Sequence, residues 1–143
     1  MSKLFNIDRF ISEYVTERKE SLFSNDLLTF HERLTEKTEG RSALVIGGAG
    51  TIGSSFIKAL LKFNISKLYV VDINENGLTE LVRDLRSSVG LNVPDDLKTY
   101  PISFSDPVFK KMFLASGPFD IVANFAAHKH VRSEKDHYSI EAM

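Results

Sequence analysis

The chain has 143 residues, of which 43% are hydrophobic and 26% are charged, with a formal net charge of −1 and no cysteine. This composition is ordinary for a globular domain, and its near-neutral charge gives no electrostatic reason to expect a nucleic-acid partner. Disulfides and cysteine-ligated metals are excluded, and no apolar run approaches the roughly 20 residues that cross a bilayer. Because charged residues interrupt the first 20 positions, we expect no secretion signal and a cytoplasmic location.

Residues 1–40 differ from the rest and are predicted to form a helical extension. Apolar residues recur there at helical spacing, at Ile7, Phe10, Ile11, Tyr14 and Val15, and a second helix is expected from about residue 24. This stripe either covers a flank of the following domain or forms a subunit contact in a homo-oligomer; disorder of the isolated segment is a third alternative. In both of the first two cases, Phe10, Ile11 and Tyr14 should be buried.

From residue 41 onward, predicted strands and helices alternate. Strands are expected at 43–46, 68–71, 100–104 and 119–127, and helices from Thr51, over 75–89 and from Asp106-Pro107, with Val108, Met112 and Phe113 facing inward. Alternation of this kind predicts a parallel sheet with right-handed crossovers. The expected fold class is therefore α/β, a Rossmann-like parallel sheet of at least four strands, with 41–143 as the N-terminal, incomplete part of an NAD(P)-binding domain.

The stretch from Ala43 to Gly53 carries the strongest motif. A short apolar strand is followed by Gly47, Gly50 and Gly53 at three-residue spacing, and then by a helix that begins with Thr51 and Ile52. Strand, glycine turn and helix is the arrangement that holds a dinucleotide pyrophosphate, with the N–H groups of the first helical turn facing the anion. The alternative is a plain glycine-rich turn of an α/β domain.

An acidic residue stands at the end of the second predicted strand. Asp72 lies 19 residues after Gly53, about where a carboxylate binds the adenosine ribose. No Arg or Lys lies near it to hold a 2′-phosphate, so NAD is favoured over NADP. Asn74 is included among the cofactor-binding residues, and the alternative is that Asp72 merely caps the next helix.

The end of the fourth predicted strand reads Asn124-Phe125-Ala126-Ala127. Small residues such as Ala126 and Ala127 would let the backbone pass close to a ribose or nicotinamide, and Asn124 could bond to a neighbouring strand; packing alone is the alternative. A basic cluster follows, comprising His128, Lys129, His130, Arg132 and Lys135. It could meet a phosphate or a sugar at the carboxyl ends of the strands, or be a solvated loop. No metal site is expected.

These motifs together resemble the N-terminal part of an extended short-chain dehydrogenase/reductase. The segment Ala126 to Glu134 is similar to one found in the polysaccharide-biosynthesis branch, which includes UDP-N-acetylglucosamine 4,6-dehydratases and members serving nonulosonic-acid pathways. The resemblance implies cofactor contacts for the glycine turn, Asp72, Ala126 and Ala127, and substrate contacts for Lys129 and His130. It also implies a UDP-sugar substrate. Ser103 departs from the family, in which an acid often faces the adenine.

The catalytic segment of that family is absent from this sequence. None of its four tyrosines is followed four residues later by lysine, so no catalytic residue is predicted here. Three functions stay open: the cofactor-binding part of a nucleotide-sugar 4,6-dehydratase or of an epimerase of the same branch, a binding module that holds NAD without chemistry, and a truncated product with no independent role.

Overall fold

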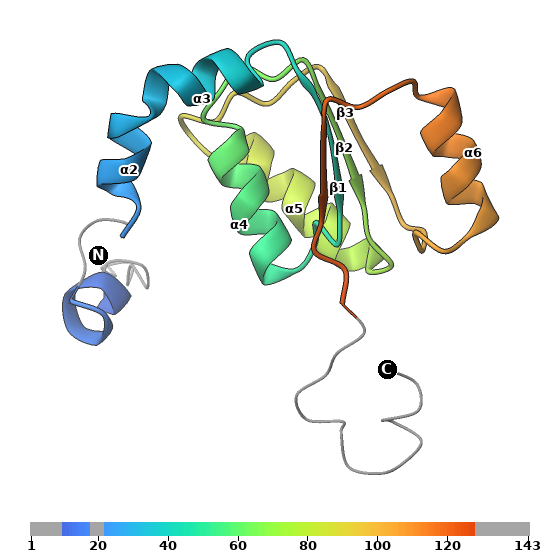
Figure 1. The fold of residues 1–143 in the computed structure, drawn as a ribbon. Coiled ribbons are helices and arrows are strands. Elements are labelled where there is room, and N and C mark those ends of the chain that lie inside the picture. The colour runs from blue at the N-terminus through green and yellow to red at the C-terminus, as the bar shows by residue number, and fades with distance from the viewer. Residues whose placement is uncertain (1–9, 18–21, 128–143) are drawn as a thin grey trace. The chain divides into compact units, whose positions relative to one another are not determined.

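The computed structural model describes residues 10–17 and 22–127 (Figure 1). By its internal contacts the chain divides into two compact units, 1–34 and 35–143, which are described separately below. The boundary predicted at residues 40 and 41 stays a prediction.

The first unit contains short helices. They are the one-turn π-helix η1 (Ile11–Val15), the helix α2 (Ser24–Thr29) and the start of α3 (His31–Thr38), so the second predicted helix is interrupted at Phe30. Phe10 and Tyr14 pack ring against ring at 5.3 Å, yet their exposed fractions are 42% and 72%, and that of Ile11 is 41%. The single chain therefore does not show the burial expected for these residues, and burial in a subunit contact stays a prediction.

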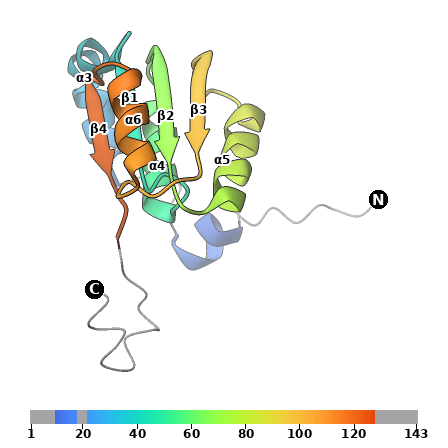
Figure 2. The ribbon, with the colours of Figure 1, turned by 90° about the vertical axis from the view of Figure 1, so that its right-hand side faces the viewer.

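The second unit is a four-stranded parallel sheet in the order β3-β2-β1-β4. Its strands are β1 (Ser42–Ile46), β2 (Lys67–Val71), β3 (Asp96–Tyr100) and β4 (Ile121–Asn124), and its helices are α4 (Thr51–Leu60), α5 (Glu75–Ser87) and α6 (Pro107–Ala115). Figure 2 shows the four strands side by side with α6 in front of them. The predicted fold class, an α/β Rossmann-like sheet with N-terminal helices, is confirmed.

Hydrophobic side chains cover both faces of this sheet. On one face, residues of β1 and β2 such as Val45 and Val70 pack with Ile57 of α4 and Leu81 of α5. On the other face, Leu44 and Val71 belong to a cluster that also includes Phe109, Met112 and Phe113 of α6. Because both faces are covered, all five residues of β1 are buried, as expected for an inner parallel strand.

Four details of the predicted strands and helices are wrong. The fourth strand covers only Ile121–Asn124 rather than 119–127. The third strand lies at Asp96–Tyr100 rather than 100–104, because Pro101 has no N–H to donate to a ladder and ends the strand. In α6 it is Phe109 that packs against the sheet, whereas Val108 is 53% exposed. In α4, Ile52 is spaced to share an apolar face with Phe56 and Leu60, yet its exposed fraction is 71%.

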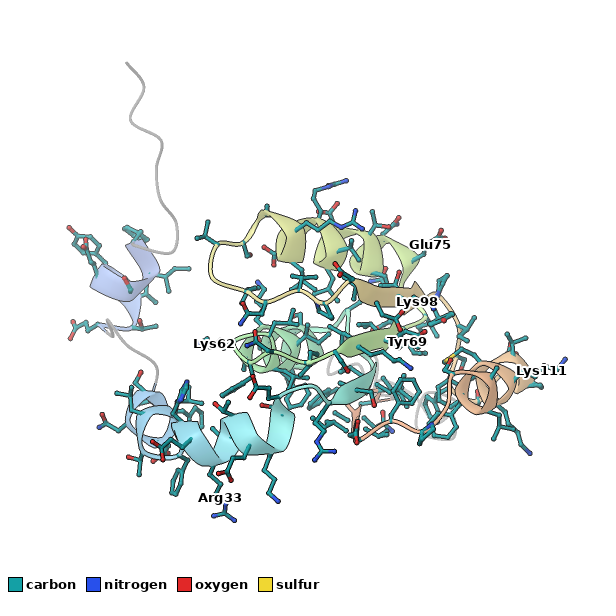
Figure 3. The ribbon with its side chains drawn as sticks, turned by 90° about the horizontal axis from the view of Figure 1, so that it is seen from above. Arg33, Lys62, Tyr69, Glu75, Lys98 and Lys111 are labelled. Atoms are coloured by element: carbon teal, nitrogen blue, oxygen red, sulfur yellow. The ribbon has the colours of Figure 1, made fainter. Side chains whose placement is uncertain are left out.

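Polar groups join the strands on the α6 side and at their amino ends. Lys98 Nζ donates to Tyr69 Oη at 2.6 Å, and the two residues lie next to one another on β3 and β2 (Figure 3). Asp120 precedes β4 and accepts hydrogen bonds from the backbone N–H and the hydroxyl of Ser42, at 2.9 and 2.7 Å. These bonds, together with the nearby Arg41 guanidinium, lower the pKa of Asp120 below its ordinary value.

Candidate functional site

A cavity of about 580 Å³ lies where β1, β2 and β4 end and the loop after β3 begins. Four segments, one after each strand, contribute most of its wall, so residues far apart in sequence meet at one edge of the sheet. Carboxyl ends of parallel strands are where ligands bind in folds of this kind. The lining residues are Ile46, Gly47, Ala49, Gly50, Val71, Asp72, Ile73, Asn74, Ile102, Ser103, Phe104, Ser105, Phe125, Ala126 and Ala127.

The glycine turn forms one side of the cavity. Gly47 has φ +75°, and a Cβ built on it would lie 2.5 Å from the Ala126 nitrogen, so both conformation and space require glycine there. Its N–H donates to the Val71 oxygen at 2.7 Å, which ties the turn to β2. At Gly53 a Cβ would collide with the Gly47 oxygen, so this glycine lets α4 start close beneath the turn.

Gly50 differs from these two positions. A Cβ built on it would meet only the Gly47 oxygen, at an ordinary 3.5 Å, and its φ of −74° and ψ of 166° suit any residue. The fold itself therefore does not need glycine there. Gly50 is also the N-cap of α4 and offers no side chain to bond the first-turn N–H groups, an end that favours an anion.

The carboxylate of Asp72 bonds to two segments of the site wall. Its Oδ2 accepts from the Ala49 N–H at 2.9 Å, and its Oδ1 accepts from the Asn74 N–H at 3.0 Å. Asn74, rather than Asp72, caps α5, because its side-chain oxygen accepts from the Gly77 N–H at 2.9 Å. The alternative that Asp72 merely caps the next helix is therefore wrong.

The rest of the wall comes from the segments that follow the two outer strands, namely the loop after β3 and the chain after β4. Ser103 and Ser105 place their hydroxyl oxygens 2.8 Å apart. Asn124 does not bond across to a neighbouring strand as predicted; its Oδ1 accepts from the Ala126 N–H at 3.0 Å, so it shapes its own turn. This loop lies within 100–104, where a strand is predicted, and Pro101 is the residue of the sequence that indicates a loop there.

The predicted site residues fall into three groups. Six line the cavity, namely Gly47, Gly50, Asp72, Asn74, Ala126 and Ala127. Four do not, namely Thr51, Ile52, Gly53 and Asn124, and their contact with a cofactor stays a prediction. Lys129 and His130 lie outside the described residues. Within 10–17 and 22–127 there is no group of three acidic or histidine residues that could hold a metal.

Comparison with known sequences finds one family and one relative of note. A family model described as polysaccharide biosynthesis protein matches residues 43–143. A protein of Methanocaldococcus jannaschii, named uncharacterized membrane protein MJ1061, is 49% identical over 47 residues, which are 33% of this chain and 14% of that protein. In the described part of the chain, no helix has the length and apolar character needed to cross a membrane.

Two solved structures share the fold, and a third is similar in sequence. A short-chain type dehydrogenase/reductase from Mycobacterium ulcerans is 21% identical, with TM-score 0.51, over 63% of this chain and 34% of its own. The MalC reductase/Diels-Alderase from Malbranchea aurantiaca is 16% identical, with TM-score 0.57, and the match covers 78% of this chain and 47% of MalC. The enzyme WbmF of Bordetella bronchiseptica, solved with NAD⁺ and UDP, is 30% identical, with TM-score 0.41, and the match covers 63% of this chain and 24% of WbmF. The chain spans less than half the length of each protein.

Proposed function

The chain belongs to the polysaccharide biosynthesis protein family, and from that premise we propose that it is the cofactor-binding part of an NAD-dependent nucleotide-sugar 4,6-dehydratase. UDP-N-acetylglucosamine is the substrate that we propose for the whole enzyme, and the cytoplasm is its proposed location. The specific reaction rests on the resemblance of Ala126 to Glu134 to that branch of the family, whereas the cofactor half rests on the geometry of the site.

The observation that carries the proposal is the cavity bounded by the glycine turn and Asp72. The protein itself requires glycine at 47 and 53 but not at Gly50, which lines the cavity and leaves space there for a phosphate to approach the backbone. Helix α4 starts directly behind this space, so its N-terminal N–H groups and positive dipole end favour a pyrophosphate. Asp72, Ile73 and the residues around Ser103 then surround the position of an adenosine.

The preferred cofactor is NAD rather than NADP. Asp72 presents its carboxylate at the rim of the cavity, where each of its oxygens keeps a second lone pair for a ribose hydroxyl. A 2′-phosphate at the same place would meet a negative charge. The segment from Asp72 to Asn76 holds no Arg or Lys that could compensate for that repulsion.

In this proposal each part of the site has its own role. The glycine turn binds and orients the pyrophosphate, Asp72 orients the ribose, and Ala126 and Ala127 leave room for the remainder of the cofactor. A bound nicotinamide would supply a reversible hydride acceptor for the sugar. We propose that Lys129 and His130 contact the substrate.

One observation favours a second candidate for the 143-residue chain taken alone. It contains no tyrosine with a lysine four residues on, the pair that carries the proton chemistry in the family it resembles. By itself it would then be a module that binds NAD without turnover. An epimerase of the same branch is the alternative for the whole protein.

Calorimetric titration of the purified chain with NAD and NADP tests the cofactor part of the proposal. Saturable NAD binding at least tenfold tighter than NADP binding is expected, and absence of NAD binding would refute it. Sequencing across codon 143 and assaying the product of the complete reading frame with UDP-N-acetylglucosamine tests the reaction. A 4-keto-6-deoxy product supports the dehydratase, whereas the C4 epimer supports the alternative.

A further inference from the structure

The bonds of Asp72 connect two parts of the chain that are separate in sequence. Its Oδ2 holds the N–H of Ala49, which is 23 residues earlier and lies in the middle of the glycine turn. Its Oδ1 holds the N–H of Asn74 at the start of α5. A single carboxylate therefore joins the turn between β1 and α4 to the turn between β2 and α5.

The turn is also close-packed against the beginning of α5. A Cβ built on Gly77 would lie 3.0 Å from the Ala49 Cβ, which is tighter than most real contacts. Ala49 is thus held at its N–H by Asp72 and at its methyl group by α5. Gly47 and Gly50 stand on either side of it, so the position of Ala49 decides where the backbone of the turn lies in the cavity.

We propose that Asp72 is a positioning residue for the pyrophosphate, acting through the Ala49 N–H, in addition to any contact with a ribose. This inference rests on the proposed function. Hydrogen bonds to a charged acceptor are stronger than neutral ones, and a binding loop held in its bound geometry before the ligand arrives gains affinity. Asp72 would then influence ligands that have no ribose at all.

Replacing Asp72 with asparagine makes the two possible effects opposite in sign. If Asp72 acts on the phosphate only through its charge, then Asp72→Asn removes a repulsion and pyrophosphate binds more tightly. If it acts by holding the turn, binding weakens. Asparagine has one carbonyl oxygen and an NH₂ group, which cannot accept a hydrogen bond from a second backbone N–H.

The probe is inorganic pyrophosphate, titrated calorimetrically into the wild-type 143-residue chain, Asp72→Asn and the control Glu75→Gln. Glu75 is an exposed carboxylate in the first turn of α5 (Figure 3), and its substitution removes one negative charge near the site without removing a bond to the glycine turn. We expect Asp72→Asn to bind pyrophosphate about tenfold more weakly, and Glu75→Gln to bind it equally or slightly more tightly. Amide hydrogen exchange at Ala49 should accelerate in Asp72→Asn without any ligand.

Equal or tighter binding of pyrophosphate by Asp72→Asn would overturn the inference and leave the proposed function intact, provided that wild type binds NAD. Unchanged exchange at Ala49 would overturn it as well. Titration of 2′,3′-dideoxy-ADP, which has a diphosphate but no ribose hydroxyls, is a separate test. If Asp72 acts only on ribose hydroxyls, wild type and Asp72→Asn should bind this ligand with equal affinity, and that result would also overturn the inference. If wild type binds neither pyrophosphate nor NAD, the proposed function fails and the inference fails with it.

Discussion

Substitution of Gly50 by alanine separates the binding role of the glycine turn from its folding role. The added methyl group would meet only the Gly47 oxygen at 3.5 Å, and the backbone angles of Gly50 suit alanine. Gly→Ala at a compatible position stabilises by about 0.4–1 kcal/mol through the unfolded chain. Alanine is a poorer N-cap than glycine by about 0.5–1 kcal/mol, so the two effects nearly cancel. The melting temperature should therefore change by no more than a few degrees.

The effect on ligand binding should be much larger. A methyl group at Gly50 would occupy the space through which a phosphate approaches the backbone at the start of α4. Displacing the phosphate would weaken at least one hydrogen bond to a charged group, worth about 1.5–3 kcal/mol. Since 1.4 kcal/mol corresponds to a factor of ten, NAD affinity should fall by about tenfold to a hundredfold.

Gly53→Ala is the matched control. A Cβ at Gly53 would collide with the Gly47 oxygen and approach Gly48 Cα at 2.8 Å, both of them backbone atoms that cannot rotate away. Forcing a methyl group into such a place costs about 1–3 kcal/mol of folding stability. Gly53→Ala should therefore melt several degrees lower than wild type, whereas Gly50→Ala should not.

Thermal unfolding followed by circular dichroism, together with calorimetric titration of NAD, measures both quantities on the same preparations. Wild-type NAD affinity in a correctly folded Gly50→Ala chain would refute the placement of the pyrophosphate against this turn. A large loss of stability in Gly50→Ala would instead refute the claim that the fold leaves this position open.

Three further predictions follow from individual residues. Wild type should prefer NAD to NADP by tenfold or more, and Asp72→Ala should reduce that ratio; equal affinities in wild type would remove Asp72 from this role. The Ser42 N–H and hydroxyl lower the pKa of Asp120 below its ordinary value of 3.8. The ionised carboxylate therefore stabilises the folded state fully above that pH, and this stabilisation is lost as the pH falls through the pKa of Asp120 in the folded protein. Urea midpoints should therefore fall less between pH 5 and pH 3 in Asp120→Asn than in wild type, and identical pH dependence would contradict this. The 143-residue chain, incubated with NAD and UDP-N-acetylglucosamine, should form no 4-keto-6-deoxy sugar; turnover lost on changing His128 or His130 would make the chain an enzyme in its own right.

The position of the site was predictable because its elements are local in sequence. Gly47, Gly50 and Asp72 follow apolar strands, and parallel strands bring their carboxyl ends to one edge of a sheet. The loop around Ser103 and Phe104 falls within 100–104, where the sequence pattern predicts a strand, but Pro101 has no N–H for a ladder and the strand ends before it. The prediction for α6 has a similar limit, because Val108 is expected to face the sheet and Phe109 does so instead. A shift of one residue in the helical pattern changes which side chains face the sheet.

Sequence alone determined the α/β class, the parallel sheet and the glycine turn with its helix. Each of these depends on patterns that are local in sequence, namely the alternation of apolar strands with helices and the spacing of the glycines. Only the tertiary structure decided which glycines the protein itself needs. It shows that Gly47 and Gly53 are closed in by backbone from Ala126 and Gly48, whereas a Cβ at Gly50 would meet only the Gly47 oxygen at an ordinary 3.5 Å. It also decided the bonds of Asp72, since its partner Ala49 is 23 residues away and meets it only after β1 and β2 have paired. Contacts of that range depend on how strands associate, and no local pattern of residues records them.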